Sequence, residues 1–192
     1  MELRTTERLN LNGYALIKNF FNKTQRNNLD SWTNQLKSFP ESKNCYMKYY
    51  ETKDDKRLLS RMENFLDYHN EVSLFELEVI RPLVESIFKE PVVLFKEKIN
   101  FKLPGGGAFE PHQDHPAWSE FPSTDYINIA IPIDEMTDDN GTLYFASGIG
   151  RDKKIYHDKE TNKIDDKLID SWKWEPVYGK LGDLLIFNSY VP

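Results

Sequence analysis

The hydrophobic pattern of the chain changes from helix-like to strand-like near Pro91, and this change constrains the fold most. In residues 92–103 polar and apolar side chains alternate, which is typical of a β-strand. Short apolar runs recur at 125–133, 142–147 and 183–188. Because turn-forming residues separate these runs, we expect a series of short strands in the second half of the chain.

The first half of the chain carries helix signals. Asn22 and Gln25 match a capping box, and apolar residues follow at spacings of three and four. Residues 23–38 are therefore expected to form an amphipathic helix. Residues 45–50 suit a strand, and the charged residues 51–57 are expected to form a loop.

A second helix is expected further along. Ser73 and Glu76 match another capping box. Pro82 interrupts this helix or kinks it, because proline lacks the backbone N–H and crowds the preceding turn. The helix is expected to end near Phe88.

Turn signals divide the strand-rich half. The glycines of residues 104–107 and the Asn-Gly of residues 138–141 favour turns, and the charged residues 151–170 favour a surface loop or a lid. Helices followed by short antiparallel strands predict a mainly β fold with flanking helices and a jelly-roll core. We expect a single domain, with a helical part at 1–90 and the core at 91–192.

Composition excludes several classes of protein. The net charge is −6 and no basic stripe is present, so a nucleic acid partner is not expected. One cysteine, Cys45, cannot make an internal disulfide or a Cys-rich zinc site. No apolar run reaches the roughly 18 residues of a membrane span, and the N-terminus does not read as a secretion signal. A cytoplasmic protein is expected.

The motif with the clearest chemical content is His112-Gln113-Asp114. In a strand, residues i and i+2 point to the same face, so His112 and Asp114 can direct a nitrogen and an oxygen to one point. Such a pair forms two thirds of the facial triad of non-haem Fe(II) oxygenases. A bare His-x-Asp is a weak signal, since two polar side chains often only bond each other.

The order of motifs along the chain resembles the phytanoyl-CoA dioxygenase family. The matching features are "NGYALIKNFF" at 12–21, "HQD" at 112–114 and the aromatic Trp118. They continue with "NGTLYFASG" at 140–148 and "GDLLIF" at 182–187. The resemblance covers nearly the whole chain, and the combination of motifs is more specific than any one of them.

The resemblance implies a double-stranded β-helix fold and an oxidoreductase. It implies that His112 and Asp114 bind Fe(II), with 2-oxoglutarate as cosubstrate and O₂ as oxidant. Because position 114 is Asp, the chain resembles the hydroxylases of the family rather than the related halogenases.

Other residues receive roles from the same resemblance. Lys96, Lys98 and Asn100 are expected to help hold 2-oxoglutarate, the alternative being that they only solvate an edge strand. His115 and Trp118 follow the metal motif and are candidates for the wall of the substrate pocket. Packing in the core is the alternative for Trp118.

Two family features are missing. The third iron ligand, a histidine, and the arginine that anchors 2-oxoglutarate would lie beyond residue 192. We expect a truncated chain, the alternative being a short chain with a defective site. The family's Pro-Gly-Ser-His turn is also replaced by Ser147-Gly148-Ile149-Gly150.

The predicted function is hydroxylation of a C–H bond in a small-molecule metabolite by an Fe(II)/2-oxoglutarate-dependent dioxygenase. One alternative is a catalytically inactive jelly-roll protein that binds a small ligand. Another is a zinc or other metal hydrolase using His112, Asp114 and His115, although His115 would point to the opposite face of a regular strand. The substrate and the oligomeric state cannot be predicted.

Overall fold

The computed structural model describes residues 2–118, 120–121, 126–149, 154–158, 161 and 163–192. The chain folds into two compact units. One unit combines the residues up to Arg26 with residues 108–192, and the other consists of residues 27–107. The first unit thus joins segments that are far apart in the sequence. The single domain with a boundary near residue 91 stays a prediction, and part of the expected 151–170 loop lies outside the described residues.

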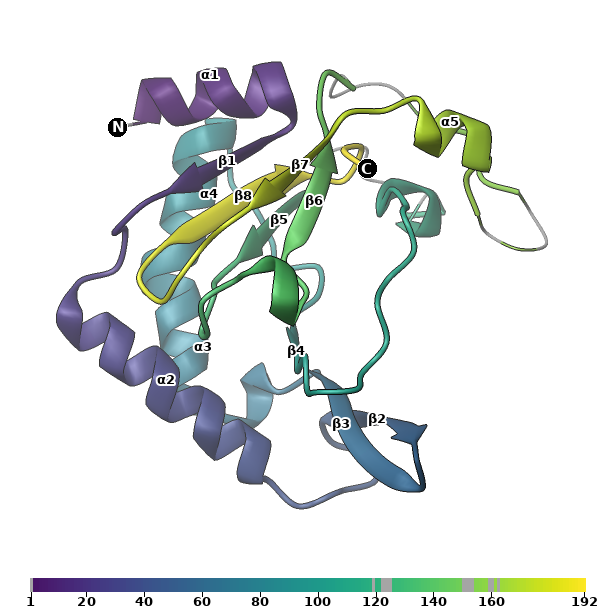
Figure 1. Cartoon of the computed structure of the whole chain (residues 1–192). Coiled ribbons are helices and arrows are strands. Elements are labelled where there is room, and N and C mark those ends of the chain that lie inside the picture. Colours follow the sequence, from purple (N-terminus) through teal and green to yellow (C-terminus); the bar gives the residue numbers. More distant parts are fainter. Residues whose placement is uncertain (1, 119, 122–125, 150–153, 159–160, 162) are drawn as a thin grey trace. The chain divides into compact units, whose positions relative to one another are not determined.

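The first unit contains two antiparallel sheets (Figure 1). Its helices and strands are α1 (Glu2–Asn12), β1 (Tyr14–Ile17), β5 (Ile127–Ala130), β6 (Leu143–Ala146), α5 (Asp166–Asp170), β7 (Trp174–Val177) and β8 (Leu184–Asn188). One sheet has the order β1-β8-β5, and the other pairs β6 with β7. The strands expected at 125–133, 142–147 and 183–188 are present, and β7 was not predicted.

β8 lies between β1 and β5 (Figure 1) and is the most deeply buried strand of this sheet. Leu184, Leu185 and Ile186 have no exposed surface. Aromatic rings join the two sheets: Phe145 of β6 stacks on Tyr14 at 4.5 Å and contacts Phe187 at 5.2 Å, centroid to centroid. The hydrophobic core of this unit therefore lies between its two sheets.

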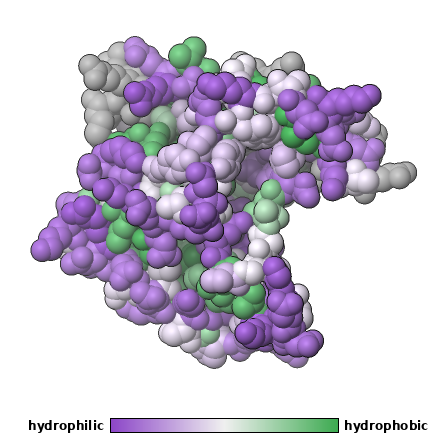
Figure 2. Space-filling model, viewed as in Figure 1, coloured by the Kyte–Doolittle hydropathy of each residue, from purple (hydrophilic) through white to green (hydrophobic). Residues whose placement is uncertain are grey.

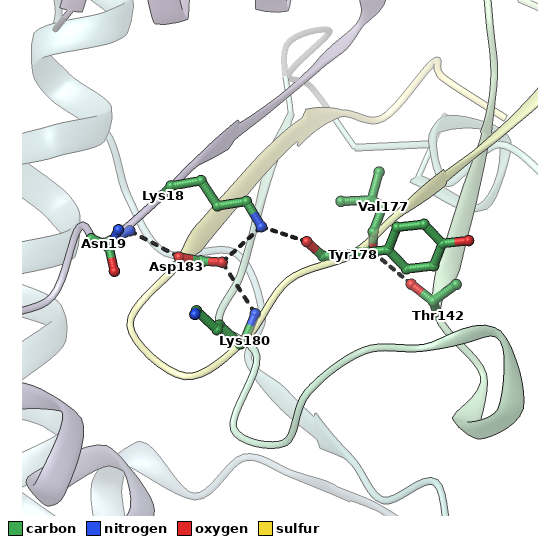
Figure 3. Close-up of polar contacts among 7 residues, drawn as sticks. All are labelled: Lys18, Asn19, Thr142, Val177, Tyr178, Lys180 and Asp183. Atoms are coloured by element: carbon green, nitrogen blue, oxygen red, sulfur yellow. Dashed lines mark hydrogen bonds and ion pairs between the residues drawn. The ribbon is translucent and has the colours of Figure 1, made fainter.

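The turn before β8 is tied to the end of β1 by a buried carboxylate (Figure 3). Asp183 is fully buried and accepts hydrogen bonds from the Asn19 backbone N–H at 2.8 Å and the Lys18 Nζ at 3.1 Å. The Lys180 backbone N–H donates to the same carboxylate at 3.2 Å. Lys18 Nζ also donates to the Tyr178 carbonyl at 2.6 Å. This network holds the register of β1 against β8.

The second unit combines helices with a three-stranded sheet of order β2-β3-β4. Its elements are most of α2 (Lys23–Ser38), then β2 (Met47–Lys53), β3 (Lys56–Glu63), α3 (Asn70–Phe75), α4 (Arg81–Phe88) and β4 (Lys98–Asn100). Its core is a cluster of Leu36, Tyr46, Met62 and Phe65. β4 is shorter than the strand expected from the alternation at 92–103, because only these three residues pair with β3.

The helix at 23–38 is confirmed together with its cap. The Gln25 backbone N–H donates to Asn22 Oδ1 and the Asn22 backbone N–H donates to Gln25 Oε1, both at 2.9 Å. The expected loop at 51–57 is wrong. The chain there forms a β2–β3 hairpin whose turn residues, Asp54 and Asp55, have φ values of 49° and 58°.

The second capping box is also wrong. Helix α3 begins at Asn70, and the His69 ring Nδ1 accepts a hydrogen bond from the Val72 backbone N–H at 3.4 Å. A π-helical turn, Glu76–Ile80, separates α3 from α4. Pro82 lies in the first turn of α4, directly after this π-helical turn, which agrees with the expected interruption of the helix at the proline. The helix ends at Phe88, as expected.

The face of the molecule in Figure 2 is mostly hydrophilic, and its hydrophobic residues lie in separate patches. Within the described part of the chain, no helix is both long enough and apolar enough to cross a membrane.

Candidate metal centre

His112 and Asp114 direct their polar atoms toward each other. His112 Nε2 lies 3.6 Å from Asp114 Oδ1. The segment 111–114 pairs with no strand, so the convergence comes from an extended but irregular backbone rather than a regular strand. The His112 side chain is 47% exposed and that of Asp114 24%. A ligand from solvent can therefore reach the pair.

The backbone sets the tautomer of His112. Its Nδ1 lies 2.7 Å from the Glu110 carbonyl oxygen. Because a carbonyl can only accept, Nδ1 carries a hydrogen, and in the neutral imidazole Nε2 carries the lone pair. Histidines that bind metals are commonly fixed by a hydrogen bond of this kind. The imidazole thus presents a metal-binding nitrogen on the side that faces Asp114.

The other oxygen of Asp114 is held from β5. Asn128 Nδ2 donates a hydrogen bond to Asp114 Oδ2 at 3.1 Å. The two oxygens of Asp114 therefore have different surroundings: Oδ1 faces the imidazole and Oδ2 faces an amide.

Gln113, between the two candidate ligands, points into the protein and is 3% exposed. Its Oε1 accepts a hydrogen bond from the Ile155 backbone N–H at 2.8 Å, and its Nε2 donates to the Tyr190 carbonyl. The Gln113 backbone N–H donates to His157 Nε2 at 3.2 Å. The metal motif is thereby tied to the 154–158 segment and to the residues that follow β8.

His115 and Trp118 are both engaged in packing. His115 is buried, its ring stacks on that of Tyr190 at 4.1 Å, and its Nε2 lies 2.9 Å from the Tyr190 hydroxyl. Trp118 contacts the ring of Tyr126 at 5.0 Å. Their role in a substrate pocket stays a prediction. Among the described residues no three His, Cys, Asp or Glu side chains form a cluster that could hold a metal, which disfavours a hydrolase site built from His112, Asp114 and His115.

Lys96, Lys98 and Asn100 belong to the 27–107 unit. Lys96 Nζ makes an ion pair with Glu63 Oε1 at 3.0 Å, whereas Lys98 and Asn100 are exposed on β4. Their expected role in holding 2-oxoglutarate stays a prediction.

The donor set suits Fe(II). An imidazole nitrogen and a carboxylate oxygen on neighbouring positions are the typical first two ligands of a facial triad. Across the described residues, no three His, Cys, Asp or Glu side chains gather closely enough to hold a metal ion. The assignment of His112 and Asp114 as two of the three protein ligands stays a prediction.

The model of the phytanoyl-CoA dioxygenase family matches residues 9–192. The chain belongs to the phytanoyl-CoA dioxygenase family. It is 39% identical over 184 residues to a 2-aminoethylphosphonate dioxygenase of an uncultured bacterium, an alignment that covers 94% of this chain and 70% of that protein. It is 33% identical over 187 residues to a methylphosphonate hydroxylase of Gimesia maris, covering 97% and 71%.

Solved structures confirm the fold. EctD from S. alaskensis, with 2-oxoglutarate and 5-hydroxyectoine bound, has a TM-score of 0.81 at 14% identity. The match covers 100% of this chain and 68% of that one. The expected mainly β fold with flanking helices and a double-stranded β-helix core is therefore correct.

This phytanoyl-CoA dioxygenase family member is an Fe(II)/2-oxoglutarate-dependent dioxygenase that uses O₂ to hydroxylate a small molecule. The expected enzyme class and cofactors are confirmed, and nothing in the comparisons supports an inactive binding protein.

Three residues of the site were not predicted from the sequence: Gln113, Asn128 and His157. Asn128 had a visible signal, because it is the polar residue in the middle of the apolar run 125–133. His157 gave none, since its partner is a backbone N–H that lies 44 positions away in the sequence.

Proposed function

We propose that the protein hydroxylates a C–H bond of a small organophosphonate and that His112 and Asp114 bind its Fe(II). The observation that carries the assignment of the ligands is the convergence of His112 Nε2 and Asp114 Oδ1 at 3.6 Å. The phosphonate class is supported by the names of two relatives, the 2-aminoethylphosphonate dioxygenase and the methylphosphonate hydroxylase.

Fe(II), 2-oxoglutarate and O₂ together supply an oxidant for an unactivated C–H bond, with succinate and CO₂ as the other products. The residues of this chain orient the reaction. His112 presents Nε2 because the Glu110 carbonyl fixes its tautomer. Gln113 ties the segment that carries both ligands to Ile155 and Tyr190 through its side-chain hydrogen bonds.

The roles of Lys96, Lys98 and Asn100 toward 2-oxoglutarate belong to the same proposal, as do those of His115 and Trp118 toward the substrate. A cytoplasmic location and the lack of a nucleic acid or membrane partner are expectations from the sequence.

The test is a hydroxylation assay of the full-length protein with Fe(II), 2-oxoglutarate, ascorbate and air. 2-Aminoethylphosphonate and methylphosphonate are offered separately, and succinate and the ³¹P spectrum are measured. The expected result is succinate formation that depends on phosphonate, together with a new phosphorus signal. L-Proline is the matched non-phosphonate substrate, since a more distant relative is an L-proline trans-4-hydroxylase.

Turnover of L-proline without turnover of either phosphonate would overturn the substrate class and leave the ligand assignment standing. Full activity in Asp114→Ala would overturn the ligand assignment itself.

A further inference from the structure

We propose that Asn128 is a positioning residue that fixes which carboxylate oxygen of Asp114 binds Fe(II). The inference rests on the proposal that His112 and Asp114 are iron ligands. It concerns a residue of β5 that lies 14 positions from Asp114 in the sequence.

The geometry separates the two oxygens of Asp114. Asn128 Nδ2 donates to Oδ2 at 3.1 Å, while Oδ1 lies 3.6 Å from His112 Nε2. An amide hydrogen bond to Oδ2 holds the carboxylate plane and directs Oδ1 toward the point that the imidazole also faces. The carboxylate is thereby prepared to bind a metal through a single oxygen.

Asn128 sits on a rigid support, whereas Asp114 does not. β5 pairs along its length with β8, and Asn128 is opposite Phe187 in that register. Asp114 belongs to a segment that pairs with no strand. A side chain on irregular backbone needs an external contact to hold its rotamer, and donors on strands position such groups more precisely than donors on loops.

The residue type fits the role. Asn is depleted in strands, and here it replaces an apolar residue in a run with Ile127 and Ile129. An amide donor orients a carboxylate without adding charge. A lysine at this place would compete with the cation for Asp114, and an aspartate would repel it.

Binding through one oxygen matters for the number of open positions. Three single-atom protein ligands leave three positions on an octahedral ion, which 2-oxoglutarate and O₂ require. A carboxylate that bound through both oxygens would take one of them. Losing an outer partner of a metal ligand typically costs about 10- to 100-fold in metal affinity or activity, and we expect that range here.

The experiment uses the full chain with Asn128→Ala and Asn128→Leu, the second nearly isosteric and lacking any donor. Fe(II) affinity and the visible charge-transfer band of the Fe(II)/2-oxoglutarate chelate are measured without oxygen. Both variants are expected to bind Fe(II) about 10- to 100-fold more weakly and to shift or weaken the band. Ile129→Val is the matched control, because it disturbs the opposite face of the same strand and leaves the hydrogen bond intact.

The role of Asn128 would be overturned if either variant folds, binds Fe(II) as tightly as the natural protein and shows an unchanged charge-transfer band. Asp114→Ala separates this failure from failure of the ligand assignment. If Asp114→Ala loses the band while the Asn128 variants keep it, only the present inference is wrong. If Asp114→Ala keeps the band, the assignment of the ligands is wrong and the inference falls with it.

Discussion

Asp183 is fully buried, and the hydrogen bonds to its carboxylate stabilise the charged form (Figure 3). Burial by itself raises the pKa of a carboxyl group. The backbone N–H of Asn19, the Lys18 ammonium and the backbone N–H of Lys180 oppose this effect, and the pKa of Asp183 lies below its ordinary value. The charged form is therefore the one that the fold stabilises.

Replacing Asp183 by Asn should lower the free energy of unfolding by about 1–3 kcal/mol, because the new amide group places donors against the Lys18 and backbone donors. Urea unfolding at neutral pH measures the difference. Asp170→Asn, on an exposed residue of α5, is the control and should change little. A stability equal to that of the natural protein would show that the network is not needed to hold β1 against β8.

The same residue predicts a dependence on pH. Because the folded pKa of Asp183 is lowered, its contribution is complete above the unfolded pKa of about 3.9 and is lost as the pH falls through the folded pKa. The stability difference between the natural protein and Asp183→Asn should therefore narrow below about pH 4. Urea titrations at several pH values test this, and a constant difference down to pH 3 would contradict it.

At the residue scale, the sequence predicts the two candidate metal ligands but not the residues that contact their segment. His112 and Asp114 stand two positions apart, so their convergence follows from local geometry. Asn128 and Gln113 act through contacts with residues 14 to 77 positions away. Such contacts depend on how the strands pair, and the spacing of residues in the sequence does not reveal that pairing.

At the scale of elements, Gln113 connects the metal motif to the 154–158 segment. Gln113→Ala should release the Ile155 backbone N–H, whose hydrogen bond to Oε1 is 2.8 Å long. We expect faster amide hydrogen exchange at Ile155, which is otherwise 5% exposed. Mass-spectrometric exchange on peptides covering 154–158 measures this.

Gln35→Ala is the matched control for that variant. Gln35 lies on α2, and its Oε1 is 3.2 Å from His69 Nε2. Its loss should leave exchange at Ile155 unchanged. Equal protection of Ile155 in Gln113→Ala and the natural protein would mean that other contacts hold this segment.

A helix or strand could be predicted where a local sequence signal marks one of its ends. Helix α2 follows the sequence closely because Asn22 and Gln25 satisfy its first N–H groups. The β2–β3 hairpin was missed because Asp54 and Asp55 adopt positive φ without the glycine that marks most such turns. A charged stretch such as 51–57 can form a long loop or the tight turn of a hairpin. Which of the two forms depends on whether the flanking residues pair as strands.

The contribution of the N-terminal cap of α2 to stability can be tested directly. Asn22→Ala should cost about 1 kcal/mol of stability, because the Gln25 backbone N–H loses its partner. Thermal or urea unfolding measures this. Asn34→Ala, on the exposed face of the same helix, should cost less. A larger loss in Asn34→Ala would contradict the importance of the cap.

At the scale of the whole molecule, the sequence predicts β5, β6 and β8 but not the strands with which they pair. β1 comes from the N-terminus and yet pairs with β8, so that Tyr14 is opposite Phe187. Pairing over such a separation is selected by the burial of β8 on both sides rather than by any turn. The resemblance to a known family supplied the jelly-roll fold, which alternation alone left as one of several β architectures.

Metal binding should stabilise the molecule as a whole. A ligand that binds only the folded state adds about 2.7 kcal/mol at 100 times its dissociation constant. Mn(II) with 2-oxoglutarate, used to avoid oxidation, should therefore raise the unfolding temperature of the full chain, and a chelator should reverse the rise. Asp114→Ala should show little of this effect, because one of the two converging donors is gone. An equal rise in Asp114→Ala would place the metal elsewhere in the protein.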